Sequence, residues 1–147
     1  MSGVVTATLW APLPVPRKRD EEALQAAVIA YLDLALPADA IAHHSPNEGK
    51  RTPRAAGTLK RSGTRRGWPD VEILWRGMPT TFIELKSARG SLDADQRAMH
   101  DKLRYCGCTV LVCRSVECVE TSLLELGMPL RATLGSTAPM RVSGGVA

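Results

Sequence analysis

The chain has 147 residues, of which 44% are hydrophobic and 23% are charged. These values fit one compact domain, whose core must be built mainly from aliphatic side chains because the sequence holds only one Phe and two Tyr. A membrane-spanning helix needs about 18 consecutive apolar residues, and no stretch of the sequence approaches this length. We therefore expect no membrane partner.

The formal net charge is +4, but the positive charge is concentrated in one segment. Between residues 50 and 67 the chain carries no acid and seven basic residues, which are Lys50, Arg51, Arg54, Lys60, Arg61, Arg65 and Arg66. Without these seven, 12 of the 19 Lys and Arg remain against 15 acids. Local basicity of this kind is typical of a surface that binds a polyanion such as a nucleic acid; the alternative is a solvated loop.

The four cysteines follow the spacing C-x-C-x4-C-x4-C, at Cys106, Cys108, Cys113 and Cys118. This spacing matches none of the paired C-x2-C arrangements that are typical of zinc sites. We therefore expect reduced cysteines that behave as small apolar groups, and a cytoplasmic protein.

The first half of the chain predicts a helix, a short strand and a long loop. Residues 1–17 are read as a flexible leader. Apolar residues at helical spacing over 20–36, with acids at the start, predict a helix that ends at Pro37. Residues 40–44 predict a short strand, and 45–67 predict a long basic loop.

The second half predicts a hairpin followed by a strand between two helices. Residues 71–75 and 80–85 are apolar and closely spaced, which favours a β-hairpin. A helix follows with Ser91 as its N-cap and Leu92, Met99, Leu103 and Cys106 on its apolar face, and it ends at Gly107. Residues 109–113 predict a buried strand and 116–126 the last helix.

This order, α-β-β-β-α-β-α, predicts an α/β (α+β) fold with a mixed central sheet flanked by helices. We place one domain at 18–128 and a disordered tail at 129–147, because the last residues are small and polar.

Three charged residues are predicted to converge at the hairpin. Side chains alternate along a strand, so Glu84 and Lys86 share one face, while Asp70 enters the neighbouring strand. Two carboxylates, with the main-chain oxygen of Leu85 between Glu84 and Lys86, suit Mg²⁺ or Mn²⁺, and a nearby lysine suits charge that develops on a phosphate. The alternative is a surface pair between Lys86 and Glu84.

Gln96 is predicted to serve this site from the next helix. It lies between Leu92 and Met99 on the apolar face, where an amide without a hydrogen-bond partner is costly. The alternative is a structural amide that is satisfied elsewhere.

With these residues the chain resembles the stand-alone VRR-NUC domains of phage and bacteria, within the PD-(D/E)xK nuclease superfamily. The similarity runs from about residue 20 to 126. It rests on ordered motifs, which are Glu21-x-x-x-Gln25, Asn47-Glu48-Gly49-Lys50-Arg51, Gly57-x-Leu59-Lys60, Gly67-x-Pro69-Asp70, Phe82-Ile83-Glu84-Leu85-Lys86 and Gly90-x-Leu92-x-x-x-Gln96.

The resemblance implies a restriction-endonuclease-like core with Asp70 and Glu84 as metal ligands and Lys86 as the catalytic lysine. It also implies a first-helix glutamate near the metal. The helical wheel and the motif spacing favour Glu21 over Glu22, although both acids also suit a helix N-terminus. Mg²⁺ or Mn²⁺ is the expected cofactor, without an organic one.

The implied function is an endonuclease that acts on structured or branched DNA such as four-way junctions, as a homodimer, in the cytoplasm of a bacterial or phage-infected cell. The residues expected to bind DNA are Asn47, Lys50, Arg51, Lys60, Arg61, Arg65 and Arg66. The alternative is a non-catalytic nucleic-acid-binding accessory module. A sequence-specific restriction enzyme would need a recognition region that the chain is too short to hold.

Overall fold

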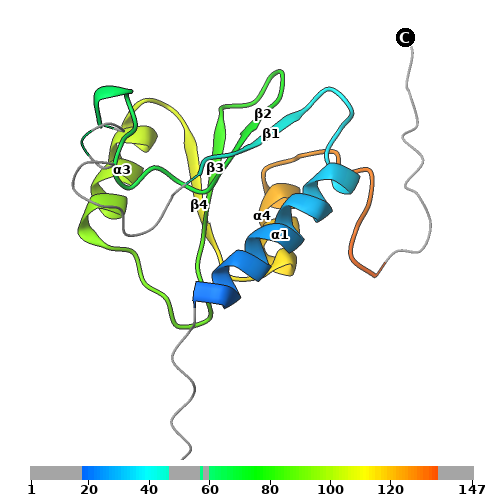
Figure 1. The fold of residues 1–147 in the computed structure, drawn as a ribbon. Helices are drawn as coiled ribbons and strands as arrows, with labels where there is room; N and C mark the ends of the chain where they lie inside the picture. Colours follow the sequence, from blue (N-terminus) through cyan, green and yellow to red (C-terminus); the bar gives the residue numbers. More distant parts are fainter. Residues whose placement is uncertain (1–17, 47–56, 58–59, 136–147) are drawn as a thin grey trace, which may run out of the picture.

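The computed structural model describes residues 18–46, 57 and 60–135 (Figure 1). Its elements are α1 (Lys18–Ala35), β1 (Ile41–His44), β2 (Val71–Leu74), β3 (Thr81–Leu85), α3 (Ala94–Tyr105), β4 (Thr109–Cys113) and α4 (Val116–Glu125). The predicted order α-β-β-β-α-β-α and the mixed α+β class are confirmed. The predicted leader at 1–17 and the end of the predicted tail at 136–147 lie outside the described residues.

The four strands form one sheet in the order β1-β2-β3-β4. The first two pairs are antiparallel, and β3 and β4 are parallel because α3 carries the chain from the end of one to the start of the other. Figure 1 shows α1 and α4 together on one side of the sheet and α3 on the other. Both faces of β3 are therefore covered, and all five of its residues are buried.

Alternation along β3 divides its side chains between two cores. Ile83 and Leu85 join the main cluster with α1 and α4. Phe82 points the other way and packs with Leu103 of α3 and with Trp68, whose ring meets the Phe82 ring edge-on at 5.3 Å. Glu84 has the same parity as Phe82, so the strand directs a carboxylate into the interior on the α3 side.

The N-terminus of α3 differs from the prediction, because the N-cap is Asp93 and not Ser91. The Asp93 carboxylate accepts a hydrogen bond from the Gln96 main-chain N at 2.8 Å, and the Gln96 side-chain oxygen accepts one from the Asp93 main-chain N at 3.1 Å. This reciprocal pair is a capping box. At the other end, Cys106 is the exposed C-cap, so the prediction that it lies on the apolar face is wrong.

The chain after α4 remains packed on the domain. Met128 and Leu130 are buried, and the Arg131 main-chain N donates to the Ala35 carbonyl at 2.6 Å. The Arg131 side chain also donates to the Asp33 carbonyl at 3.1 Å, so it satisfies free carbonyls at the C-terminus of α1. The predicted boundary at 128 is therefore too early, and residues 129–135 belong to the fold.

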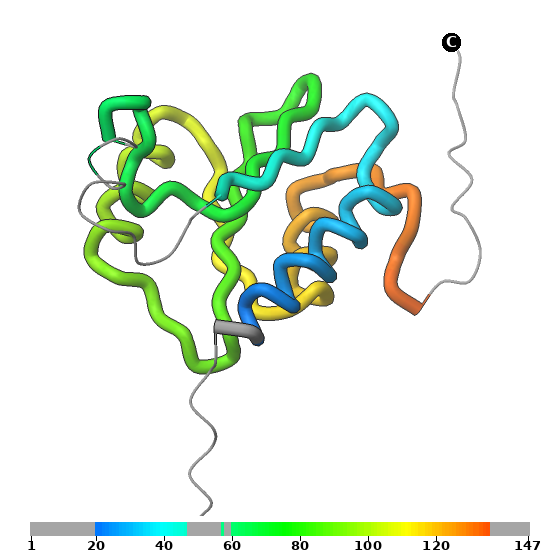
Figure 2. Tube along the Cα trace, in the orientation of Figure 1, coloured from blue at the N-terminus to red at the C-terminus, as the bar shows by residue number. Residues whose placement is uncertain are grey.

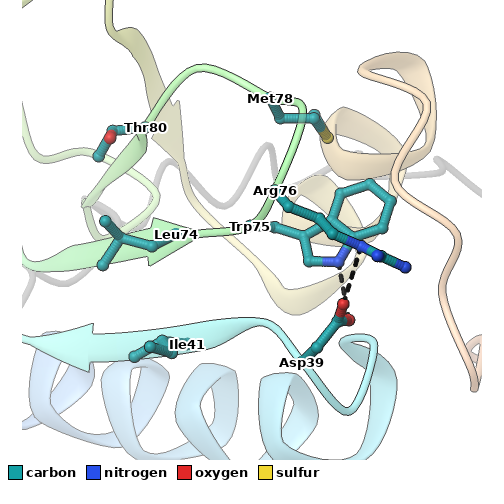
Figure 3. A pocket seen from close by; sticks show the side chains of 7 residues that line it. All are labelled: Asp39, Ile41, Leu74, Trp75, Arg76, Met78 and Thr80. Atoms are coloured by element: carbon teal, nitrogen blue, oxygen red, sulfur yellow. Dashed lines mark hydrogen bonds and ion pairs between the residues drawn. The ribbon is translucent and has the colours of Figure 1, made fainter.

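An open pocket of about 340 Å³ lies at the far end of the hairpin (Figure 3). Asp39 closes one side by accepting hydrogen bonds from Trp75 at 2.8 Å and Arg76 at 3.1 Å. The exposed side chains of Ile41 and Leu74 line it. Leu74 ends β2, whereas Asp70 precedes that strand, so this pocket is separate from the predicted site.

No helix in the described part of the chain is long and apolar enough to cross a membrane.

Candidate active site

Asp70 is held against the strand that carries Glu84. Its Oδ2 accepts a hydrogen bond from the Leu85 main-chain N at 2.7 Å. Its main-chain oxygen accepts one from the Ser45 N at 2.8 Å and lies 3.0 Å from His44 Nδ1. These contacts from β1 and β3 fix both ends of the residue, so the hairpin brings Asp70 to Glu84 as the sequence predicts.

Glu84 is the buried centre of the site, with only 1% of the residue exposed. Its Oε1 accepts a hydrogen bond from Gln96 Nε2 at 2.6 Å and lies 3.0 Å from Lys86 Nζ. Lys86 is itself only 9% exposed, so the alternative of a solvent-exposed pair does not apply. Glu84 Oε2 is buried and has no hydrogen-bond partner among the described residues.

Burial raises the pKa of Glu84 to about 7, with a further contribution from the Asp70 carboxylate, and Lys86 opposes the rise. The charged form of a carboxylate loses more hydration than the neutral form on burial, which is why the pKa moves upward. Near neutral pH the metal-free site therefore holds a partly protonated carboxyl group beside an ionisable neighbour. A cation bound between the two acids would stabilise their ionised forms, because it neutralises negative charge that is buried away from water.

The raised pKa predicts how stability changes with pH in the metal-free protein. Glu84 titrates near 4.5 when unfolded and near 7 when folded, so its favourable contribution is complete below pH 4.5 and is lost as the pH rises through 7. Relative to Glu84→Gln, the wild type should lose up to about 3 kcal/mol of unfolding free energy over this range. Urea denaturation at several pH values, with a chelator present, measures this difference. Parallel pH curves for the two proteins would contradict the assignment.

His100 is a member of the site that sequence reasoning missed. It is 1% exposed, neither ring nitrogen has a hydrogen-bond partner among the described residues, and its Nε2 lies 3.6 Å from Glu84 Oε2. Burial lowers the pKa of His100, so the ring is neutral at pH 7 and the contact is not an ion pair. The sequence feature that could have indicated His100 is its position four residues after Gln96, because residues at this spacing lie on the same face of a helix.

Gln25 and His44 form a second layer behind Asp70. Gln25 Nε2 lies 2.7 Å from His44 Nε2, and His44 in turn contacts the Asp70 main-chain oxygen. Gln25 belongs to the motif Glu21-x-x-x-Gln25, but the sequence alone does not predict which group it contacts. The structure supplies that partner, and thereby connects α1 to Asp70 through β1.

Glu21 lies at the edge of the site, beside the loop that follows β3. Its Oε1 accepts a hydrogen bond from the Ser87 main-chain N at 3.4 Å. Figure 2 shows the start of α1 next to this loop. Glu21 is half-buried there, whereas Glu22 is exposed. Glu21 thus contacts the loop that follows Lys86, and its role near a metal stays a prediction.

Among the described residues, the carboxylates of Asp70 and Glu84 lie at the centre of the site, and Glu21 lies at its edge, where it accepts a hydrogen bond from the Ser87 main-chain N. Within the described ranges, no group of three or more His, Cys, Asp or Glu side chains is arranged to hold a metal ion. The buried and unpartnered Glu84 Oε2 next to a second carboxylate nevertheless fits a hard cation, because Mg²⁺ is commonly held by one or two carboxylates, waters and substrate oxygens.

The described part of the basic segment contacts the start of α3 at its end. Residues 57, 60 and 61 are helical, so the prediction of a continuous loop over 45–67 is wrong at these positions. Lys60, Arg61, Arg65 and Arg66 are all exposed, and Arg66 Nη1 lies 3.7 Å from Asp95 Oδ2 at the start of α3. Gly67, with φ of +73°, packs directly on the first turn of that helix. Asn47, Lys50 and Arg51 lie outside the described residues.

The fold and the site together define a mixed α+β domain with a buried carboxylate and lysine at the end of one central strand. The model of the VRR-NUC domain family matches residues 13–117, which is more than half of the chain. The chain belongs to the VRR-NUC domain family, whose members are nuclease-type domains that process nucleic acid.

Two solved structures are similar to this chain. A VRR_NUC domain protein is 21% identical, with a TM-score of 0.57 over 78% of this chain and 90% of its own, which shows a shared fold. A second structure, a VRR_NUC domain, is 20% identical with a TM-score of 0.47, over 72% of this chain and 95% of its own. No curated protein shows significant similarity to the chain.

Proposed function

We propose that the protein is a metal-dependent endonuclease that hydrolyses phosphodiester bonds in DNA. The observation that supports this most is the buried Glu84, which is held by Gln96 and Lys86 on one oxygen and left without a hydrogen bond on the other. A protein that only binds DNA gains nothing from burying a carboxylate beside a second acid, because both repel phosphate.

Asp70 and Glu84 would hold Mg²⁺ or Mn²⁺, with the main-chain oxygen of Leu85 and the carboxylate of Glu21 as further oxygen donors. The ion, when bound, polarises the phosphate and makes a bound water more acidic. Gln96 then keeps Glu84 Oε1 oriented, so that Oε2 stays available for the ion.

Lys86 has two tasks in this proposal. With its Nζ 3.0 Å from Glu84 Oε1, it counters the negative charge of the two acids. It also presents an ammonium group that can orient the attacking water by hydrogen bonding and stabilise the negative charge that develops on the phosphate. Both tasks require that Nζ stays next to Glu84 Oε1, and the burial of Lys86 favours this position because it restricts the movement of the side chain.

The DNA would approach over the basic loop. The exposed Arg65 and Arg66 precede Asp70 by only a few residues, so we expect phosphates that bind these arginines to lie on the side of the domain where Asp70 enters β2. By family resemblance we propose branched DNA such as four-way junctions as the substrate, and a homodimer in the cytoplasm as the active form. The free cysteines of the chain agree with a reducing compartment.

The test is incubation with Mg²⁺ or Mn²⁺ and a panel of single-stranded, duplex, flap and four-way-junction DNA. We expect cleavage that a chelator stops, with the junction cut fastest. Glu84→Ala should abolish cleavage and keep DNA affinity within about 3-fold, and the exposed Glu125→Ala should cleave like the wild type. Binding by the wild type without cleavage of any substrate would favour the accessory module and overturn the enzymatic proposal.

A further inference from the structure

Arg114 directly follows the C-terminal end of β4, and Lys86 directly follows the C-terminal end of the neighbouring strand β3. The two strands are parallel and Leu85 pairs with Cys113. The residues that follow this pair, Lys86 and Arg114, therefore lie side by side where the two strands end. The ladder extends one step further, because the Lys86 main-chain N donates to the Cys113 carbonyl at 3.0 Å. This register places an exposed arginine next to the residue that carries the ammonium group of the site.

The guanidinium group of Arg114 binds the loop that follows Lys86. Its Nη1 donates to the Ser87 carbonyl and to the Gly90 carbonyl, both at 2.6 Å. The Gly90 main-chain N also donates to the Ser87 carbonyl at 3.1 Å, so residues 87–90 form a closed turn. One charged donor thus joins the two ends of this turn.

The turn covers the side chain of Lys86. A Cβ placed on Gly90 would lie 3.4 Å from Lys86 Cδ, 3.2 Å from Glu21 Oε1 and 3.0 Å from Ser87 Oγ. The main chain at Gly90 therefore rests on the lysine stem and beside the glutamate of α1. This cover contributes to leaving the Lys86 side chain only 11% exposed, with Nζ at Glu84.

We propose that Arg114 is a positioning residue for the reaction, which clamps the turn at 87–90 over Lys86 and thereby confines Nζ to Glu84. The inference rests on the proposed nuclease function for its catalytic consequence, but the clamp itself is a property of the fold. An open turn would expose the lysine stem and let Nζ leave the carboxylate for solvent. Arg114 acts through Lys86 and needs no contact with DNA.

The first measurement reports the clamp without any nuclease activity. Arg89 lies in the turn and is exposed, so tryptic cleavage after Arg89 follows the opening of the turn. Arg114→Met should accelerate this cleavage about 10-fold or more, because two hydrogen bonds to a charged group are lost. The matched control is Arg104→Met. Arg104, like Arg114, is an arginine that donates to a main-chain carbonyl, but its acceptor is Val110 in β4 at 3.2 Å and not a residue of the turn.

The second measurement reports catalysis. In Arg114→Met we expect kcat for DNA cleavage to fall about 10-fold or more with KM within about 2-fold, with Arg114→Lys in between and Arg104→Met unchanged. Equal proteolysis of Arg114→Met and wild type would overturn the clamp. Faster proteolysis with unchanged kcat would overturn the positioning role. If the wild type cuts no DNA, faster proteolysis still supports the clamp, and only the nuclease proposal fails.

Discussion

Lys86→Met should lower the rate of DNA cleavage about 10²–10³-fold while DNA affinity stays within about 3-fold. Methionine keeps the apolar stem, which the turn at 87–90 covers, and removes the ammonium group that lies 3.0 Å from Glu84 Oε1. The loss should appear in kcat, because the ammonium stabilises charge that develops during the reaction. Single-turnover cleavage of the best DNA substrate and a separate binding titration measure the two quantities.

The control for this variant is Lys102→Met, which removes an exposed lysine from α3. It changes the net charge by the same amount, so any loss through weaker attraction of DNA appears equally in both variants. A rate for Lys86→Met close to that of Lys102→Met would show that Lys86 only balances the charge of Glu84. Thermal unfolding of both variants shows whether the fold is intact.

Gly67→Ala should destabilise the protein by about 2–5 kcal/mol, the sum of a left-handed alanine and a steric clash. Gly67 has φ of +73°, and a Cβ there would lie 2.4 Å from the Asp95 carbonyl oxygen and 2.7 Å from the Gln96 main-chain N. Both atoms belong to the backbone of α3, so relief requires that the loop and the helix separate. Chemical denaturation measures the loss.

Gly77→Ala is the matched control, because Gly77 has φ of +75° and nothing within 4 Å of its Cβ position. It should cost only the conformational strain, about 1–2 kcal/mol. The difference between the two variants isolates the contact of the loop with α3. Equal losses would contradict that contact. A folded Gly67→Ala protein should also cut DNA more slowly, since Gln96 would shift away from Glu84.

Much of this fold follows from local pattern. The alternation in residues 81–85 is enough to place Glu84 and Lys86 on one face, and the spacing of Gly67, Pro69 and Asp70 marks the entry to β2. The apolar position of Gln96 correctly demands a partner. Each of these inferences depends on residues close together in the chain, for which the periodicity of helix or strand is sufficient.

Local pattern misled where two residues of similar propensity compete. Ser91 and Asp93 are both good N-caps, and Asp93 is selected because Gln96 closes the capping box. The polar composition after α4 favoured a tail, but it did not reveal that Leu130 finds a buried position and that Arg131 caps α1.

The sequence by itself determined the order of the elements and the presence of two acids and a lysine on neighbouring strands. Only the tertiary structure decided that Gln96 meets Glu84, that His100 lies behind it and that Arg114 closes the turn over Lys86. These contacts join different elements, and their distances depend on how closely α3 and β4 pack against β3. Periodicity along the chain assigns a residue to a face, but the packing of that face against another element selects its partner.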